Sequence, residues 1–160
     1  MGSGEYLSVT ALGDAMAAAR ADGAVLSNDG GKTWRPMGLP KMLTRIHRIL
    51  FSPDGTLWLG AREGVYFSSD LGKTWMWIER LPLRDVDDLS YDPDEKRVFV
   101  SSQSSDQIFG IDPQSMTWKW WQTGSRVALI RTGGGRLVAT SVNDGVLLGP
   151  DAAEAETTQK

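Results

Sequence analysis

The 160-residue sequence contains no cysteine and only one histidine. The absence of cysteine excludes disulfide bridges, thiolate zinc sites and cysteine nucleophiles. One histidine cannot supply a histidine-rich metal site or a pair of catalytic histidines. Because His47 alternates with Arg45 along an expected strand, we predict a packing or surface role for it. We therefore expect no metal and no cofactor.

Long apolar runs and a strong excess of one charge are also missing. No run approaches the roughly 18 apolar residues that a membrane-spanning helix needs. The N-terminal region is a poor signal peptide, because Glu5, Asp14 and Arg20 interrupt it. The net charge of −3 and the pI of about 5.1 argue against a general nucleic-acid or anionic-membrane binder. We expect neither nucleic acid nor membrane insertion.

The two ends of the chain carry little folding information. The opening MGSG (1–4) is interpreted as a cloning remnant or an arbitrary start. The closing DAAEAETTQK (151–160) is polar and lacks large apolar residues, so we predict a disordered tail.

A repeated phrase is the clearest positive feature. SNDGGKTW (27–34) recurs 41 residues later as SSDLGKTW (68–75). A degraded copy, GIDPQSMTW (110–118), has one extra residue, and NDGVLLGPD (143–151) begins a fourth copy without reaching the Thr-Trp pair. A fixed period of about 40 residues is typical of repeat architectures.

A second turn recurs between these copies, as SPDGT (52–56), DPDEKR (92–97) and TGGGR (132–136). Clusters of Gly, Pro and Asp between β-branched and aromatic residues indicate hairpins. Each unit therefore has four short strands, and the composition, with 18 glycines and 7 tryptophans, is consistent with this. In the second unit, the predicted strands cover 45–51, 56–61, 64–69 and 74–79.

These repeats predict an all-β fold, a β-propeller of four-stranded antiparallel blades. We expect about four blades, three complete and one lacking its outer strand, within a segment covering 5–150. DAMAAARADG (14–23) has the helix propensity of alanine, but its register matches the strands of the second unit, so we predict a strand. The predicted blades cover about 5–38, 45–80, 86–122 and 126–150.

The phrase Ser-x-Asp-x-Gly-x-Thr-Trp resembles the Asp-box, or BNR repeat, of sialidases, sortilin-type receptors and photosystem II assembly-factor propellers. In those families the motif lies on the face opposite the usual ligand site, which implies a structural role here. The residues that match it are Ser27, Asp29, Gly31, Thr33 and Trp34, then Ser68, Asp70, Gly72, Thr74 and Trp75, and in the degraded copy Asp112, Thr117 and Trp118.

Turn chemistry supports the same structural interpretation. The Asp side chain can accept hydrogen bonds from backbone N–H groups of its own turn, and the Gly allows a positive φ. The Trp ring is expected to be buried between blades. A calcium loop is not indicated, because acidic ligands at alternate positions and a closing Glu are missing.

Arginines gather in the loops that would form the opposite face. Arginine offers a planar fork for carboxylates and is frequent at interfaces. The alternative is ordinary solvated charge, balanced by nearby acidic residues. The candidate partner face consists of Arg20, Arg45, Arg62, Arg80, Arg84 and Arg126.

Enzyme interpretations have less support. The sialidase resemblance would imply an arginine triad, a Tyr–Glu nucleophile pair and an acid/base Asp. The tyrosines are Tyr6, Tyr66 and Tyr91, but the family's N-terminal arginine signature is absent and no Tyr–Glu pair can be assigned. TWKWWQ (117–122) could form an aromatic sugar platform, although packing between blades is favoured.

We therefore predict a non-enzymatic Asp-box propeller that acts as a protein-interaction or assembly scaffold, closest to the photosystem II assembly-factor group. The alternative is a carbohydrate-active propeller, a lectin or a sialidase-like relic. Since Asp-box propellers generally have six or more blades, the chain is a part of a longer propeller, a self-associating subunit or a four-bladed ring. The residues leave the compartment open, and the resemblance favours the periplasm or the cell exterior.

Overall fold

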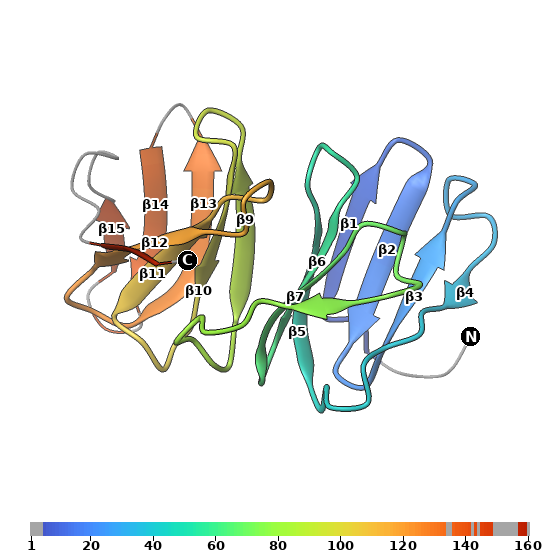
Figure 1. Cartoon of the computed structure of the whole chain (residues 1–160), viewed down its shortest axis with the longest axis horizontal. Helices are drawn as coiled ribbons and strands as arrows, with labels where there is room; N and C mark the ends of the chain where they lie inside the picture. Colours follow the sequence, from blue (N-terminus) through green and yellow to red (C-terminus); the bar gives the residue numbers. More distant parts are fainter. Residues whose placement is uncertain (1–4, 134–135, 142, 144, 149–156, 160) are drawn as a thin grey trace. The chain divides into compact units, whose positions relative to one another are not determined.

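The computed structural model describes residues 5–133, 136–141, 143, 145–148 and 157–159. Every regular element in this part of the chain is a β-strand, and every pairing between strands is antiparallel (Figure 1). The strands form four sheets. The predicted all-β class is confirmed.

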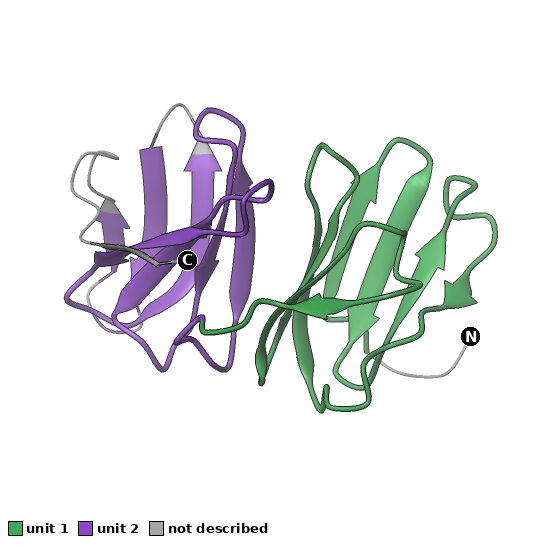
Figure 2. Cartoon of the chain, viewed as in Figure 1, with its two compact units in different colours: residues 1–80 green, residues 81–160 purple. Residues whose placement is uncertain are grey.

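The chain divides into two compact units, residues 1–80 and residues 81–160 (Figure 2). Unit 1 contains two sheets of four strands each, and neighbours in sequence are neighbours in the sheet. Sheet 1 consists of β1 (Ser8–Leu12), β2 (Ala15–Arg20), β3 (Gly23–Ser27) and β4 (Arg35–Pro36). Sheet 2 consists of β5 (Ile46–Phe51), β6 (Leu57–Ala61), β7 (Gly64–Ser68) and β8 (Met76–Trp77).

Unit 2 repeats this plan with two variations. Sheet 3 consists of β9 (Asp88–Asp92), β10 (Arg97–Ser101), β11 (Gln107–Ile111) and β12 (Trp118–Gln122), and β16 (Thr157–Gln159) pairs with β12 as a fifth strand. Sheet 4 has three strands, β13 (Val127–Gly133), β14 (Arg136–Ser141) and β15 (Val146–Leu148). A sheet without its outer strand was expected at this position.

The alanine-rich segment is strand β2, as predicted against its helix propensity. Ala17 and Ala19 are fully buried beneath the next sheet, where a larger side chain would meet its neighbours. Small residues are therefore selected by the close approach of two sheets, which overrides the local preference for helix.

The prediction of a disordered tail is wrong for Thr157–Gln159. These residues form β16, paired antiparallel with Trp118–Trp120 of β12. Residues 151–156 and 160 lie outside the described residues, as do residues 1–4. Residues 157–159 form a strand because the outer edge of β12 would otherwise present unpaired N–H and C=O groups, which β16 pairs with. Sequence polarity carries no sign of such a long-range pairing.

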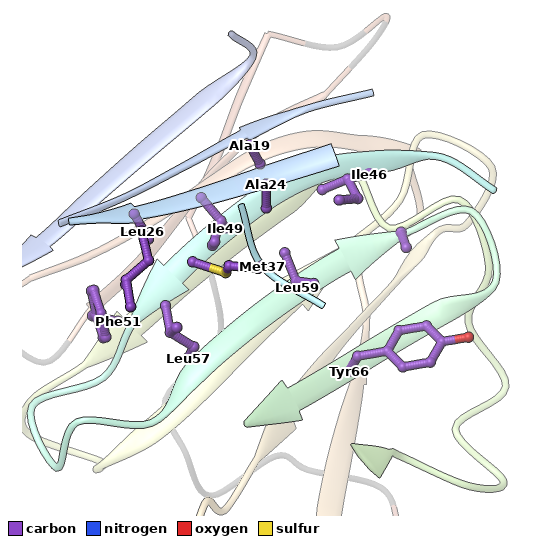
Figure 3. Close-up of a cluster of buried hydrophobic side chains, with 12 residues drawn as sticks. Ala19, Ala24, Leu26, Met37, Ile46, Ile49, Phe51, Leu57, Leu59 and Tyr66 are labelled. Atoms are coloured by element: carbon purple, nitrogen blue, oxygen red, sulfur yellow. The ribbon is translucent and has the colours of Figure 1, made fainter. Parts of the chain in front are cut away.

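The core of unit 1 lies between its two sheets (Figure 3). Sheet 1 contributes small side chains and Leu26, and sheet 2 contributes large ones such as Leu57 and Leu59. Met37, which follows β4, lies between the sheets and is 7% exposed. Small residues facing large ones allow the two pleated surfaces to interdigitate.

The core of unit 2 is more aromatic. Trp121 of β12 packs on Phe99 of β10 with ring centroids 5.4 Å apart. It joins Val127 and Ile130 of sheet 4 in one buried cluster. Gly110 lies between the two rings, because a Cβ there would come within 2.9 Å of Trp121 and 3.1 Å of Phe99. A position without a side chain is therefore required for the two tilted rings to pack at this distance.

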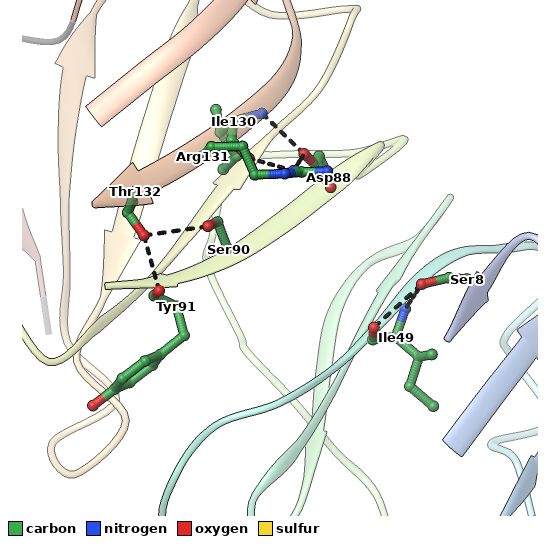
Figure 4. Close-up of polar contacts among 8 residues, drawn as sticks. All are labelled: Ser8, Ile49, Asp88, Ser90, Tyr91, Ile130, Arg131 and Thr132. Atoms are coloured by element: carbon green, nitrogen blue, oxygen red, sulfur yellow. Dashed lines mark hydrogen bonds and ion pairs between the residues drawn. The ribbon is translucent and has the colours of Figure 1, made fainter. Parts of the chain in front are cut away.

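Hydrogen bonds connect the first strands of successive sheets within each unit (Figure 4). The Ser8 hydroxyl accepts from the N–H of Ile49 at 3.1 Å and donates to its carbonyl at 3.2 Å. In unit 2, the buried Asp88 carboxylate accepts from the Ile130 N–H and from the Arg131 guanidinium at 2.9 and 2.7 Å. The partners are about one repeat apart, so these bonds fix the register of one sheet on the next.

Gly110→Ala should lower the free energy of unfolding by about 1–3 kcal/mol, because its methyl group would overlap the Trp121 ring in a packed core. Chemical denaturation followed by tryptophan fluorescence measures this. Gly38→Ala is the matched control, since a Cβ at Gly38 meets nothing within 4 Å, and it should change stability by less than about 0.5 kcal/mol. Equal stability of the two variants would contradict the packing described here.

Candidate functional site

The first repeated phrase forms a closed turn between β3 and β4. Ser27 Oγ donates to Asp29 Oδ1 at 2.7 Å and accepts from the Gly31 N–H at 2.9 Å. The Asp29 carboxylate accepts from both the backbone N–H and the hydroxyl of Thr33, at 2.9 and 2.6 Å. Trp34 Nε1 donates to the Gly31 carbonyl at 2.9 Å. The side chains of Ser27, Asp29, Thr33 and Trp34 therefore all have partners inside the turn.

The second copy, between β7 and β8, reproduces the bonds among Ser, Asp, Gly and Thr, whereas the buried Trp75 Nε1 has no hydrogen-bond partner among the described residues. Ser68 donates to Asp70 at 2.8 Å, and Asp70 accepts from the N–H and hydroxyl of Thr74 at 2.9 and 2.6 Å. Gly31 and Gly72 have φ of +86° and +75°, which explains the glycine in the phrase. Leu71 also has a positive φ of 59°, so this copy contains a strained residue where the first has Gly30.

These hydrogen bonds change the acidity of the two carboxyl groups. The hydroxyl and N–H of Thr33, followed by Ser27, lower the pKa of Asp29 to about 2. The corresponding bonds from Thr74 and Ser68 hold the pKa of Asp70 well below its usual range. Both carboxylates are ionised at neutral pH, and each of their oxygens accepts at least one hydrogen bond from its own turn. They are poor candidates for proton transfer.

The degraded third copy has different contacts. Asp112 accepts from the N–H groups of Gln114 and Ser115 at 2.8 and 3.3 Å, an Asx-type turn. The Thr117 hydroxyl pairs with Ser115 Oγ at 2.8 Å instead of with the aspartate. Gly110 occupies the position of the Ser, so the hydroxyl that organises the other two turns is missing.

The three motif tryptophans differ in burial. Trp118 is 5% exposed and meets Phe109 edge-on, with centroids 5.5 Å apart. Trp75 is half-buried against the core of unit 1, and its ring lies near Gly72. Trp34 is half-buried too, but it lines a surface cavity.

Three of the candidate arginines come together at one end of unit 1, opposite the repeated turns. The Arg62 N–H donates to the Arg45 carbonyl at 2.9 Å, which joins the β6–β7 turn to the segment before β5. The adjacent Ile46 N–H donates to the Ala21 carbonyl at 2.9 Å, next to Arg20. Arg45 and Arg62 have exposed side chains, and neither has an ion-pair partner among the described residues. We call this the arginine end.

The acidic neighbour of this end is held in place. Glu63 accepts from the N–H of Thr44 at 3.2 Å and from its hydroxyl, so its carboxylate is directed toward the loop before β5. Arg20 is different from the other two arginines. Its guanidinium lies 6.0 Å from the Tyr6 ring and 3.4 Å from Asp22, so its position is defined within the unit.

The remaining candidates are separate from these three. Arg84 donates to the carbonyls of Leu81 and Leu83 at 3.1 and 2.9 Å, which gives it a local structural role in unit 2. Arg126 is exposed in the loop before β13, and Arg80 is exposed with a φ of 62°. The six arginines therefore do not behave as one set.

A cavity of about 640 Å³ lies beside the arginine end, and the sequence analysis did not find it. Tyr6, Val25, Trp34 and Pro36 form its apolar wall, with Arg20 and Asp22 at its rim. Residues that are distant in sequence meet here, so only the pairing of β1, β2, β3 and β4 reveals it. Asp22 is the single carboxylate in the lining.

The described residues contain no group of three metal-ligating side chains. None of the described elements is a helix able to cross a membrane. His47 has an interaction partner and is half-buried in β5.

Comparison with known proteins identifies the fold. No protein-family model matches the chain, and no curated protein does. The solved structure of YCF48 bound to D1 peptide matches with a TM-score of 0.72 at 16% identity, over 98% of this chain and 54% of that one. A chain of the nidogen/laminin complex gives 0.76 at 15%, over 94% and 61%. The GH74 enzyme of Niastella koreensis gives 0.75 at 16%, over 95% and 24%.

These matches confirm the predicted β-propeller fold, with the four sheets as blades. They are consistent with the Asp-box-like propeller repeat that the sequence resembles. The chain spans only a little over half the length of the first two structures. An enzyme and binding proteins share this architecture, so the fold is compatible with both kinds of activity.

The turn carboxylates predict a pH dependence. The pKa of Asp29 is about 2 in the folded chain, below its ordinary value of 3.8. Its ionised carboxylate therefore stabilises the fold fully at pH values above 3.8, and this stabilisation disappears as the pH falls toward 2. Asp29→Asn should therefore be less stable than the wild-type chain at pH 7, with the difference shrinking as the pH falls from 4 to about 2. Urea denaturation at a series of pH values measures this.

The control is Asp22→Asn, whose carboxylate is 79% exposed and makes only one long ion pair. It should follow the wild-type curve at every pH. A stability difference for Asp29→Asn that stays constant down to pH 2 would contradict the assignment.

Proposed function

We propose that the chain is a non-enzymatic interaction scaffold that holds an acidic segment of a partner protein at the arginine end. The observation that carries this is the pair of exposed guanidinium groups, Arg45 and Arg62, on loops joined by a backbone hydrogen bond. Among the described residues, no carboxylate forms an ion pair with either of these two guanidinium groups. A pair of guanidinium groups on a rigid frame suits carboxylates of an extended peptide.

The structural neighbours support a protein partner in general terms. One is a propeller bound to a peptide, and another belongs to a protein–protein complex. At this level of identity they share the fold alone with this chain, so the proposal depends on its own arginines. Propeller loops that connect the second and third strands vary freely on a rigid frame, which suits partner recognition.

A scaffold without catalysis also fits the carboxylates. Asp29 and Asp70 are occupied by their turns, and Glu63 is held by Thr44. The cavity has one carboxylate in its lining, whereas hydrolysis of a glycosidic bond generally uses two. The carbohydrate alternative draws support from the aromatic wall of that cavity, where Tyr6 and Trp34 could stack on a sugar ring.

The double variant Arg45→Glu/Arg62→Glu should weaken binding to acidic peptides by about tenfold or more, because two attractions become repulsions. The measurement uses an array of acidic peptides, followed by titration of the best binder. Lys32→Glu/Lys73→Glu makes the same charge change on the repeated turns at the opposite end of the strands, and should leave binding intact.

Equal loss in both double variants would show that only net charge matters and would contradict the assigned site. A glycan array run in parallel separates the alternative. Sugar binding, with no acidic peptide bound, would favour a lectin over the scaffold.

A further inference from the structure

Among the described residues of unit 1, no second sheet packs on one of the two faces of sheet 1. Alternate residues of sheet 1, including Ala17, Ala24 and Leu26, are buried against sheet 2. The residues between them point to the other side. There the strand registers align Val9, Ala18, Val25 and Pro36 in one apolar row across all four strands.

Comparison with the second repeat unit indicates what would cover this face of sheet 1. Ala18 and Val25 correspond, 41 residues later, to Leu59 and Tyr66 of sheet 2. Those two residues are 0% and 5% exposed, because sheet 1 covers them. In the row on sheet 1, the small Ala18 is 9% exposed and Val25 is half-buried, whereas Val9 in the edge strand is 67% exposed. The uncovered face is thus the equivalent of a surface that another blade buries.

Trp34 supports the same equivalence. Its counterpart Trp75 packs beside Gly72, and Met37 from the preceding blade approaches that glycine so closely that a Cβ would lie 2.8 Å from its sulfur. Among the described residues of unit 1, no sheet is in the corresponding place beside Trp34, whose side chain lines the 640 Å³ cavity. The cavity occupies the place where a neighbouring blade packs in the second repeat.

Unit 2 also has a sheet face with exposed apolar residues, on sheet 4. Ala139 and Leu137 of sheet 4 are buried toward sheet 3. The alternate residues face away, and the register places Leu129, Thr140 and Val146 in one row. Leu129 is 44% exposed and Val146 is 66% exposed.

We propose that the free face of sheet 1 and the free face of sheet 4 are the two halves of one blade–blade interface, completed between two copies of this chain. Sheet 4 of one copy packs on sheet 1 of the other, so the contact is heterologous. We choose a second copy as the occupant because each copy has both of these faces. Within each unit, two such apolar faces of neighbouring sheets pack on one another. Burying both rows removes exposed apolar area from water.

The matched structures are consistent with this pairing. This chain spans 54% and 61% of the first two propellers it matches, so each of those chains is longer than one copy of this one. The arginine end is formed by loops at the strand ends of unit 1 and is not part of either row.

The test uses two surface variants, Val9→Asp on sheet 1 and Val146→Asp on sheet 4. Both positions are about two-thirds exposed, so the substitutions should leave each chain folded. In sedimentation velocity over a concentration series, the wild-type chain should be a dimer. Each variant alone should self-associate at least about tenfold more weakly, because every contact would bury an unpaired carboxylate.

Mixing the two variants is the decisive step. The intact sheet 4 of Val9→Asp can then dock on the intact sheet 1 of Val146→Asp, so the mixture should form heterodimers through this one contact, although neither variant forms dimers alone. The two substituted faces should stay apart, because their contact would bury both carboxylates. Restored pairing also demonstrates that both variants are folded. Met42→Asp, in the loop before β5 and 73% exposed, is the matched control and should dimerise like the wild-type chain.

Three results would overturn the proposal. A wild-type chain that stays monomeric and unfolds cooperatively would show that no second copy is needed. A dimer of one variant alone would indicate that one face pairs with itself. A mixture without heterodimers, from variants with wild-type circular dichroism spectra, would exclude pairing between these two faces. Because Arg45→Glu/Arg62→Glu should still dimerise, failure of this proposal is distinguishable from failure of the proposed function.

Discussion

The requirement that both faces of every sheet be covered determines most of this structure. A four-stranded sheet of alternating apolar residues cannot bury both faces alone, so successive sheets must pack on one another. In unit 1 this contact combines the small residues of β2 with the large residues of β6, and Met37 fills the space between them. In unit 2 it combines two stacked aromatic rings with Gly110. The repeated turns matter because they hold the outer hairpins in the register that these contacts need.

The repeated turn illustrates how one phrase can be conserved within a chain without forming an active site. Its Ser, Asp, Gly and Thr form a closed set of hydrogen bonds that is nearly identical in both copies. Both oxygens of each carboxylate accept hydrogen bonds from donors of the same turn. Function is therefore better sought at the opposite ends of the same strands, where Arg45 and Arg62 are exposed.

Much of the fold could be predicted from the sequence, because its signals are local and repeated. Turn residues mark each hairpin, and the 41-residue spacing of Asp29 and Asp70 reveals the period. The long-range features could not be predicted. The pairing of β16 with β12 has no sequence pattern. The cavity depends on Tyr6 and Trp34 meeting across a sheet, and Arg84 looks like a surface arginine until its two carbonyl partners are known.

The central claim is that the repeated turns are structural and that the arginine end of unit 1 binds a partner. Peptide-resolved amide hydrogen exchange, with and without a bound acidic peptide, tests both parts in one measurement. The account predicts slow exchange at the Gly31, Thr33 and Thr74 amides, unchanged by the peptide, because their acceptors lie within the turns. New protection should appear at residues 44–46 and 61–63. Protection gained at residues 29–33 and 70–74 instead, with no change at the arginine end, would contradict the account.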